Sequence, residues 1–207
     1  MISVKICGIT KYEDAAEAVK LGAYALGFIF ASSARQVSPE RARNIIRSLP
    51  PFVKTVGVFV NEAPSTIRNI VDLCGLDLVQ LHGDESLDLC NELMPYTIKA
   101  LRIKDDSIVQ SIESYRGKVR AILLDTYVKD TPGGTGKTFD WELALKAKEF
   151  GIPIILSGGL GPNNIEDAIK TVQPYAVDVN SGVEESPGKK SSILLRELFL
   201  KIKRLQA

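Results

Sequence analysis

The stretch VKICGITKYEDAAEAVKLG, residues 4–22, joins a short apolar run to a longer amphipathic one through a single glycine. The first run has the apolar character of a buried strand and ends on Cys7, which is followed directly by Gly8. The second run has the periodicity of an amphipathic helix and stops at Gly22, a residue typical of helix ends. The stretch therefore predicts one strand–turn–helix unit.

The same unit recurs along the whole chain. β-type runs fall at 4–7, 25–30, 54–60, 76–82, 97–103, 121–126, 152–158 and 175–181. Helical runs fall at 11–22, 38–49, 64–75, 86–93, 106–117, 141–151, 162–172 and 191–205, with helix starts indicated at Ser38-Pro39 and Pro162-Asn163. Eight regular units without a break in composition predict an α/β protein: one compact (β/α)8 TIM barrel that forms a single catalytic domain over residues 1–207. An open doubly wound sheet is the alternative, because its strands read much the same way.

Composition limits the class of protein. Hydrophobic residues make up 45% of the chain, enough for a sizeable core, and the 26 basic and 25 acidic residues nearly balance. This balance gives no indication of a nucleic-acid or membrane partner. The three cysteines, Cys7, Cys74 and Cys90, have no metal-ligand spacing, and the chain carries neither a secretory signal nor a membrane-spanning run. We therefore expect a soluble cytoplasmic protein with reduced thiols.

Polar residues gather where the predicted strands end. In a barrel of this kind the chemistry collects at the C-terminal ends of the strands. The residues expected there, in chain order, are Cys7, Phe28 to Phe30, Asn61, Gln80 and His82, Arg102, Asp125, Ser157 with Gly158 and Gly159, and Asn180 with Ser181 and Gly182. This rim is therefore the predicted active site.

Two glycine-rich turns at the rim predict a phosphate site. SGGLGPNN (157–164) follows the seventh strand and NSGVE (180–184) the eighth, the two loops that bind phosphate most often in this fold. The GKT in TPGGTGKTFDW (131–141) is not a nucleotide P-loop, because Thr131 stands where that motif requires glycine. We interpret 131–141 as a mobile loop over the rim, with Lys137 available to an anionic substrate, and expect no ATP.

Cys7 and Asp125 are the titratable groups that end two central strands, and they are the candidate general base and general acid. A cysteine base needs a thiolate, and an aspartate acid must hold its proton, which partial burial favours. His82 is the only histidine, so metal sites built on several histidines are excluded. A thiol-hydrolase triad of these three residues is an alternative, but no oxyanion turn follows Cys7. Gln80 and His82 are expected to shape the substrate pocket or simply to fill it.

Three further residues carry predictions of their own. Arg35 follows the second strand. It either binds a substrate carboxylate through two parallel N–H bonds or is a solvated loop residue. Lys5 and Asp178 each lie two residues before a rim position on strands that become neighbours if the barrel closes. Alternation then turns both side chains into the barrel, so we predict a buried Lys5–Asp178 ion pair.

Eight blocks of the sequence together resemble the phosphoribosylanthranilate isomerases of tryptophan biosynthesis. They are VKICGIT, SARQVSPE, VGVFVN, VQLHGDE, LLDT, GGTGKTFDW, LSGGLGPNNI and AVDVNSGVEESPGKK, in the family's order and spacing. The resemblance implies a monofunctional barrel enzyme without cofactor or metal. It would convert N-(5-phosphoribosyl)anthranilate to 1-(2-carboxyphenylamino)-1-deoxyribulose 5-phosphate by an Amadori rearrangement.

The resemblance also implies roles for individual residues. The family's general base and general acid correspond to Cys7 and Asp125, and its carboxylate-binding arginine corresponds to Arg35. Gly8 would leave the space in which the sugar sits. The remaining predicted substrate-binding residues are Gln80, His82, Gly134, Gly158, Gly159, Asp178, Asn180, Ser181 and Gly182.

Two positions depart from the family pattern. Asn180 stands where the family usually has serine, and Ser191 stands where it often has an acidic residue.

The alternative functions are a histidine-pathway type of sugar-phosphate isomerase that uses two aspartates, and a barrel that binds a sugar phosphate as a non-catalytic sensor. The partner expected is the small-molecule substrate. The oligomeric state, monomer or homodimer, stays open, with exposed cysteines or an apolar loop as possible dimer contacts.

Overall fold

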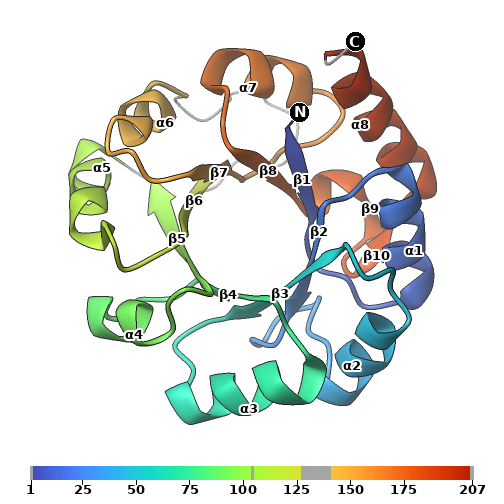
Figure 1. Cartoon of the computed structure of the whole chain (residues 1–207). Helices are drawn as coiled ribbons and strands as arrows, with labels where there is room; N and C mark the ends of the chain where they lie inside the picture. The colour runs from blue at the N-terminus through green and yellow to red at the C-terminus, as the bar shows by residue number, and fades with distance from the viewer. Residues whose placement is uncertain (1, 104, 127–140, 206–207) are drawn as a thin grey trace.

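The computed structural model describes residues 2–103, 105–126 and 141–205. In this part of the chain, eight parallel strands form a closed barrel with the helices around it (Figure 1). The strands are β1 Ser3–Ile6, β2 Ala25–Ile29, β3 Lys54–Phe59, β4 Leu78–Leu81, β5 Thr97–Ile103, β6 Ala121–Thr126, β7 Ile154–Leu156 and β8 Ala176–Val179. The helices are α1 Tyr12–Leu21, α2 Pro39–Arg47, α3 Pro64–Cys74, α4 Leu87–Glu92, α5 Asp106–Ser111, α6 Trp141–Lys148, α7 Ile165–Val172 and α8 Ser192–Arg204, with 3-10 helices η1 Ile112–Tyr115 and η2 Ser181–Val183.

The barrel closes through β1 and β8. Val4 is in register with Val177 and Lys5 with Asp178, and the other strands pair in chain order. This closure confirms the predicted (β/α)8 barrel and rules out the open sheet. Because all eight strands are parallel, their C-terminal ends meet at one rim.

The first unit folds as its sequence predicts. Side chains alternate along β1, so Val4 and Ile6 pack in the outer core together with Ala15 and Ala18 of α1. α1 ends where Gly22 adopts the left-handed conformation, with φ 118°, and closes the helix through its backbone N–H.

Differences from the predicted helices are clearest in α7 and α5. α7 begins at Ile165 and not at Pro162-Asn163, because the Asn164 side chain bonds the backbone of Gly161 and Gly159 and holds a turn before the helix. The predicted helix 106–117 is α5 followed by the tighter η1. Serine hydroxyls there donate to backbone carbonyls at the junction, an arrangement that competes with regular helix geometry.

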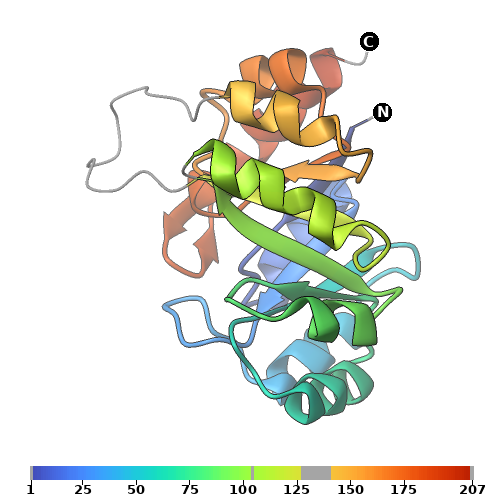
Figure 2. The same ribbon diagram turned by 90° about the vertical axis from the view of Figure 1, so that its left-hand side faces the viewer.

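A short hairpin after β8 was not predicted. Strand β9, Glu184–Ser186, pairs antiparallel with β10, Lys189–Lys190, and Gly188 between them has φ 79°. Figure 2 shows this hairpin at the same end of the barrel as the loop that follows β2. The hairpin therefore extends the rim at which the strands end.

All three cysteines are free and buried, which corrects the idea that exposed cysteines could form a dimer contact. Within the described ranges, no helix has both the length and the apolar character needed to cross a membrane.

Candidate active site

A cavity of about 180 Å³ opens at the C-terminal ends of the strands. Its lining residues are Cys7, Ile29, Val58, Gln80, His82, Asp125, Ser157, Gly158, Gly159, Leu160, Asp178, Asn180 and Ser181. The predicted candidates Arg102 and Asn61 are exposed and do not line it. A larger cavity of about 520 Å³ lies at the opposite end and includes Ser3, Tyr24 and Pro153 at the strand beginnings. We assign the site to the smaller cavity, because the groups able to transfer protons converge there.

Cys7 is almost fully enclosed, with 4% of its surface exposed. It directly follows β1, and its backbone N–H donates to the carbonyl of Val179 at 2.9 Å. A Cβ on Gly27 would lie 2.7 Å from the Cys7 sulfur and 3.1 Å from Cε of Lys5, so glycine is required there. Burial raises the pKa of the Cys7 thiol above its ordinary value, and the positive charge of Lys5 acts in the opposite direction.

Lys5 lies beneath Cys7 and forms the predicted ion pair with Asp178. Its ammonium nitrogen is 3.0 Å from Oδ2 of Asp178, and both side chains are 5% exposed. The same nitrogen donates to Oε1 of Gln80 at 2.9 Å. Burial alone would lower the pKa of Lys5, but the Asp178 carboxylate and Cys7 together more than offset this, and the pKa is raised.

Gln80 and His82 connect this pair to Asp125. Nε2 of Gln80 lies 2.9 Å from Nδ1 of His82, and Nε2 of His82 lies 3.0 Å from Oδ2 of Asp125. Both ring nitrogens of His82 are therefore occupied by neighbours other than Cys7. This arrangement does not form the triad of a thiol hydrolase.

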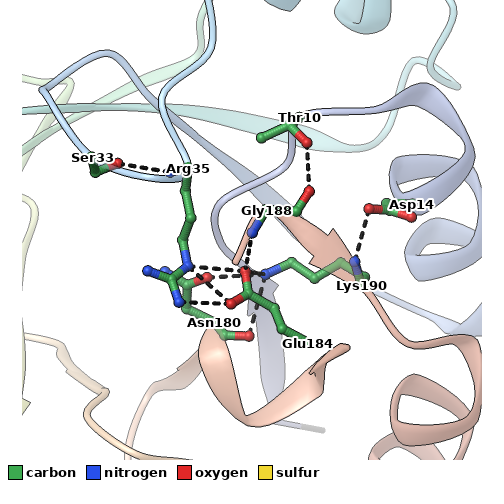
Figure 3. Close-up of polar contacts among 8 residues, drawn as sticks. All are labelled: Thr10, Asp14, Ser33, Arg35, Asn180, Glu184, Gly188 and Lys190. Carbon is green, nitrogen blue, oxygen red and sulfur yellow. Dashed lines mark hydrogen bonds and ion pairs between the residues drawn. The ribbon is translucent and has the colours of Figure 1, made fainter. Parts of the chain in front are cut away.

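Arg35 and the β9–β10 hairpin form a second charge cluster beside the cavity, in which the Glu184 and Lys190 side chains are buried and that of Arg35 is 24% exposed (Figure 3). Nε of Arg35 is 3.0 Å from each carboxylate oxygen of Glu184, and Nη2 is 2.7 Å from Oε2. Lys190 is fully buried and donates to Oε1 of Glu184 at 2.9 Å and to Oδ1 of Asn180 at 3.0 Å. Burial alone would raise the pKa of Glu184, but the bonds from Arg35 and Lys190 lower it below its ordinary value.

The same region corrects the expected role of Gly8. Its φ of 73° is left-handed, so the glycine is required, but a side chain there would not point into empty space. A Cβ on Gly8 would lie 2.7 Å from Oδ1 of Asn180 and 3.1 Å from Cδ of Arg35. Gly8 therefore leaves room for these two side chains, and not for a sugar.

The two glycine-rich loops meet backbone to backbone. Gly158 and Gly159 have φ of 88° and 62°. A Cβ on Gly182 would lie 2.0 Å from the carbonyl oxygen of Leu160, a distance that only glycine avoids. Ser181, Gly158 and Gly159 line the cavity directly, whereas Gly182 supports them through this contact. Gly134 and Lys137 lie outside the described residues.

Glu184 and Lys190 are the functional candidates that sequence reasoning missed. Both lie within the block AVDVNSGVEESPGKK, but charged residues are mostly exposed in proteins, so the sequence gives no reason to expect these two side chains to be buried. The only signal in the sequence was the turn residue Gly188 between two charged pairs.

Of the two departures from the family pattern, Asn180 accepts a bond from Lys190, and Ser191 caps α8 by accepting from the N–H of Leu194.

Among the described residues, no group of three or more His, Cys, Asp or Glu side chains is placed to hold a metal ion.

Comparisons with known proteins identify one family. The family model described as "N-(5'phosphoribosyl)anthranilate (PRA) isomerase" matches residues 4–201. A Geobacter sulfurreducens protein named N-(5'-phosphoribosyl)anthranilate isomerase is 52% identical over 98% of this chain and 99% of its own length. The crystal structure of phosphoribosyl anthranilate isomerase from Thermotoga maritima has a TM-score of 0.91 and 45% identity, covering 99% of this chain and 100% of that one. A phosphoribosyl anthranilate isomerase solved in complex with reduced 1-(o-carboxyphenylamino)-1-deoxyribulose 5-phosphate has a TM-score of 0.89 and 42% identity, with the same coverage.

Proposed function

Because the chain belongs to the N-(5'-phosphoribosyl)anthranilate isomerase family, we propose that Cys7 is the general base and Asp125 the general acid of its reaction. The protein is an isomerase of tryptophan biosynthesis, and its substrate is a small molecule. The reaction is the Amadori rearrangement of N-(5'-phosphoribosyl)anthranilate. This membership sets aside the histidine-pathway type of isomerase and the non-catalytic sensor.

The observation that carries the proposal is the convergence of the two groups on one cavity. Cys7 follows β1 and Asp125 lies near the end of β6, and both line the same space. Cys7 is buried, whereas 31% of the Asp125 side chain remains exposed. A base and an acid that face one enclosed substrate from different strands are what a proton transfer between two of its atoms requires.

The reaction then runs in three steps. Asp125 protonates the ribose ring oxygen, the bond from C1 to that oxygen breaks, and the nitrogen lone pair forms a C1=N iminium. The Cys7 thiolate removes the proton from C2, and the electrons of that bond form the C1=C2 enolamine while the iminium π electrons return to nitrogen. The enolamine takes a proton at C1 and loses one from the C2 hydroxyl, which gives the ketone. The iminium of the substrate is the electron sink.

Two anchors hold the substrate at its ends. Gly158, Gly159 and Ser181 offer backbone N–H groups to the phosphate, as glycine-rich turns at strand ends do. Glu184 engages Nε and Nη2 of Arg35 and holds one edge of the guanidinium. Among the described residues, Nη1 of Arg35 has no hydrogen-bond partner. The edge of the guanidinium that carries Nη1 is therefore available to donate two hydrogen bonds to the carboxylate of anthranilate.

Three finer assignments complete the proposal. The protein acts in the cytoplasm, as its free cysteines suggest. It is a monomer or a homodimer, which sedimentation equilibrium distinguishes. Gly134, outside the described residues, also contacts the substrate, and its replacement by alanine is expected to raise KM.

The test is the rate of turnover with deuterium at C2 of the substrate. Asp125→Asn and Cys7→Ser should each lose ~10²-fold or more in kcat, because each removes a proton-transfer group. Limited by proton removal, Cys7→Ser should show a primary isotope effect, whereas Asp125→Asn, limited by ring opening, should not. The matched control is Cys74→Ser, a buried thiol outside the cavity.

Binding separates catalysis from folding in this test. Both variants should bind reduced 1-(o-carboxyphenylamino)-1-deoxyribulose 5-phosphate as the wild type does, because phosphate and carboxylate are held elsewhere. A Cys7→Ser enzyme with wild-type kcat would return Cys7 to the role of a small buried apolar residue.

A further inference from the structure

An unbroken row of hydrogen bonds runs from the buried Lys5 ammonium to the Asp125 carboxylate. Lys5 Nζ lies 2.9 Å from Gln80 Oε1, and Gln80 Nε2 lies 2.9 Å from His82 Nδ1. His82 Nε2 then lies 3.0 Å from Asp125 Oδ2. Lys5 and Gln80 are 4% and 1% exposed, so water does not compete at that end of the row.

The chemistry of the first link fixes the direction of every later one. An ammonium group can only donate, so Gln80 must present its carbonyl oxygen to Lys5. The Gln80 amide nitrogen then faces His82 and donates to Nδ1, which must be an unprotonated acceptor. A neutral imidazole with a bare Nδ1 carries its proton on Nε2 and donates it to Asp125.

We propose that Lys5 and Gln80 fix His82 as the Nε2–H tautomer, and that His82 is thereby a positioning residue for the general acid. The inference rests on the proposed role of Asp125. It adds a role to the expectation that Gln80 and His82, which both line the cavity, shape the substrate pocket or simply fill it.

The consequence for Asp125 concerns which oxygen carries the proton. Oδ2 accepts from His82, so it cannot donate to the same nitrogen, whatever the charge on the carboxyl group. The acidic proton is therefore confined to Oδ1, which accepts no hydrogen bond from the described residues. Such an arrangement holds the proton on the oxygen that is free to face the ribose ring.

Nitrogen NMR tests the tautomer directly, because His82 is the only histidine of the chain. In ¹⁵N-labelled protein at pH 7 without substrate, long-range correlations from the ring carbon protons should show a protonated Nε2 and a bare Nδ1. In Gln80→Glu, a carboxylate accepts from both neighbours, so Nδ1 of His82 should become protonated. The matched control, Gln110→Glu, makes the same change at an exposed position of α5 and should leave the wild-type pattern.

Kinetics test the positioning role. His82→Leu should lower kcat about 10- to 100-fold, the effect expected for losing a hydrogen bond to a charged group, with KM little changed. His82→Gln places an amide N–H near the position of Nε2, and its kcat should be at least about ten times that of His82→Leu.

Several outcomes would overturn the inference. They are a protonated Nδ1 in the wild type, an unaltered proton position in Gln80→Glu, equal losses in the two His82 variants, or a raised KM with intact kcat. The proposed function fails separately, if Asp125→Asn keeps wild-type kcat, and in that case the NMR result still stands on its own.

Discussion

Removing one charge of the Lys5–Asp178 pair is expected to destabilise the barrel strongly. The two charged groups are 3.0 Å apart, and each side chain is 5% exposed. Asp178→Asn keeps the shape of the side chain and leaves a carbonyl oxygen that can face Lys5, but it leaves the ammonium without a countercharge. A buried charge deprived of its partner is far more costly than a pair that was never present.

The structure places the effect at the lower end of the usual range. Breaking a buried pair by removing one partner typically costs ~3–5 kcal/mol in the free energy of unfolding. Gln80 still accepts from Lys5, and the new amide still offers an acceptor, so we expect ~3 kcal/mol. With an m-value of ~2 kcal/mol/M for urea, the unfolding midpoint should fall by ~1.5 M.

Urea unfolding followed by circular dichroism at pH 7 measures this shift, and a double-mutant cycle isolates the pair. Lys5→Met should cost a similar amount, because it leaves Asp178 unpaired, whereas Lys5→Met/Asp178→Asn should be more stable than the poorer single variant. The control is Asp106→Asn, whose partner Lys146 is half exposed, and its midpoint should hardly move. A single variant with a wild-type midpoint, or a double variant as unstable as the sum of the singles, would refute the reasoning.

Other predictions concern substrate binding, acid stability and capping. Arg35→Lys should raise KM more than it lowers kcat, because lysine cannot fork a carboxylate, and Glu184→Gln should show the same pattern more weakly; steady-state kinetics decide both. Burial alone would raise the pKa of Glu85, but Lys99 and the backbone N–H of Asn61 together lower it. The ionised Glu85 therefore stabilises the fold above its unfolded pKa near 4.5, and this stabilisation is lost as pH falls through its folded pKa. Because Glu85→Gln removes the titrating group, the Tm of this variant should fall less steeply than that of the wild type as pH drops below 4.5. Ser191→Ala should cost ~1 kcal/mol in urea unfolding by removing the cap of α8.

The barrel was predictable because its signal is local and repeated. Each strand is a short apolar run, and each helix shows its own periodicity, so eight units could be read without any knowledge of long-range contacts. Cys7, Asp125 and the glycine-rich loops followed from the same pattern, because parallel strands in a closed barrel end at one rim. The Lys5–Asp178 pair was predictable for a related reason, since alternation and closure together determine which residues face each other.

The hairpin and its contacts were not predictable, because their stability is not local. Glu184 and Lys190 lie in a charged run without apolar alternation, and Arg35, which binds Glu184, is 149 residues from it in the chain. Gly8 shows the same limit. Its left-handed turn is a local requirement, but the side chains of Asn180 and Arg35 that fill the space beside it come from the segments that follow β8 and β2.

The two charge clusters explain how one enclosed thiol can face both an acid and a substrate carboxylate. Burial disfavours the Cys7 thiolate, and the positive charges of Lys5 and Lys190 offset part of that penalty. Each ammonium is paired with a carboxylate, and its bonds lead to a different part of the site. The bonds of Lys5 lead through Gln80 toward the acid, and those of Lys190 through Glu184 to Arg35 and the expected carboxylate of the substrate. These lysines are neither the acid nor the base, so a motif search for acids and bases passes over them, yet the relative placement of base, acid and anchor depends on where they are buried.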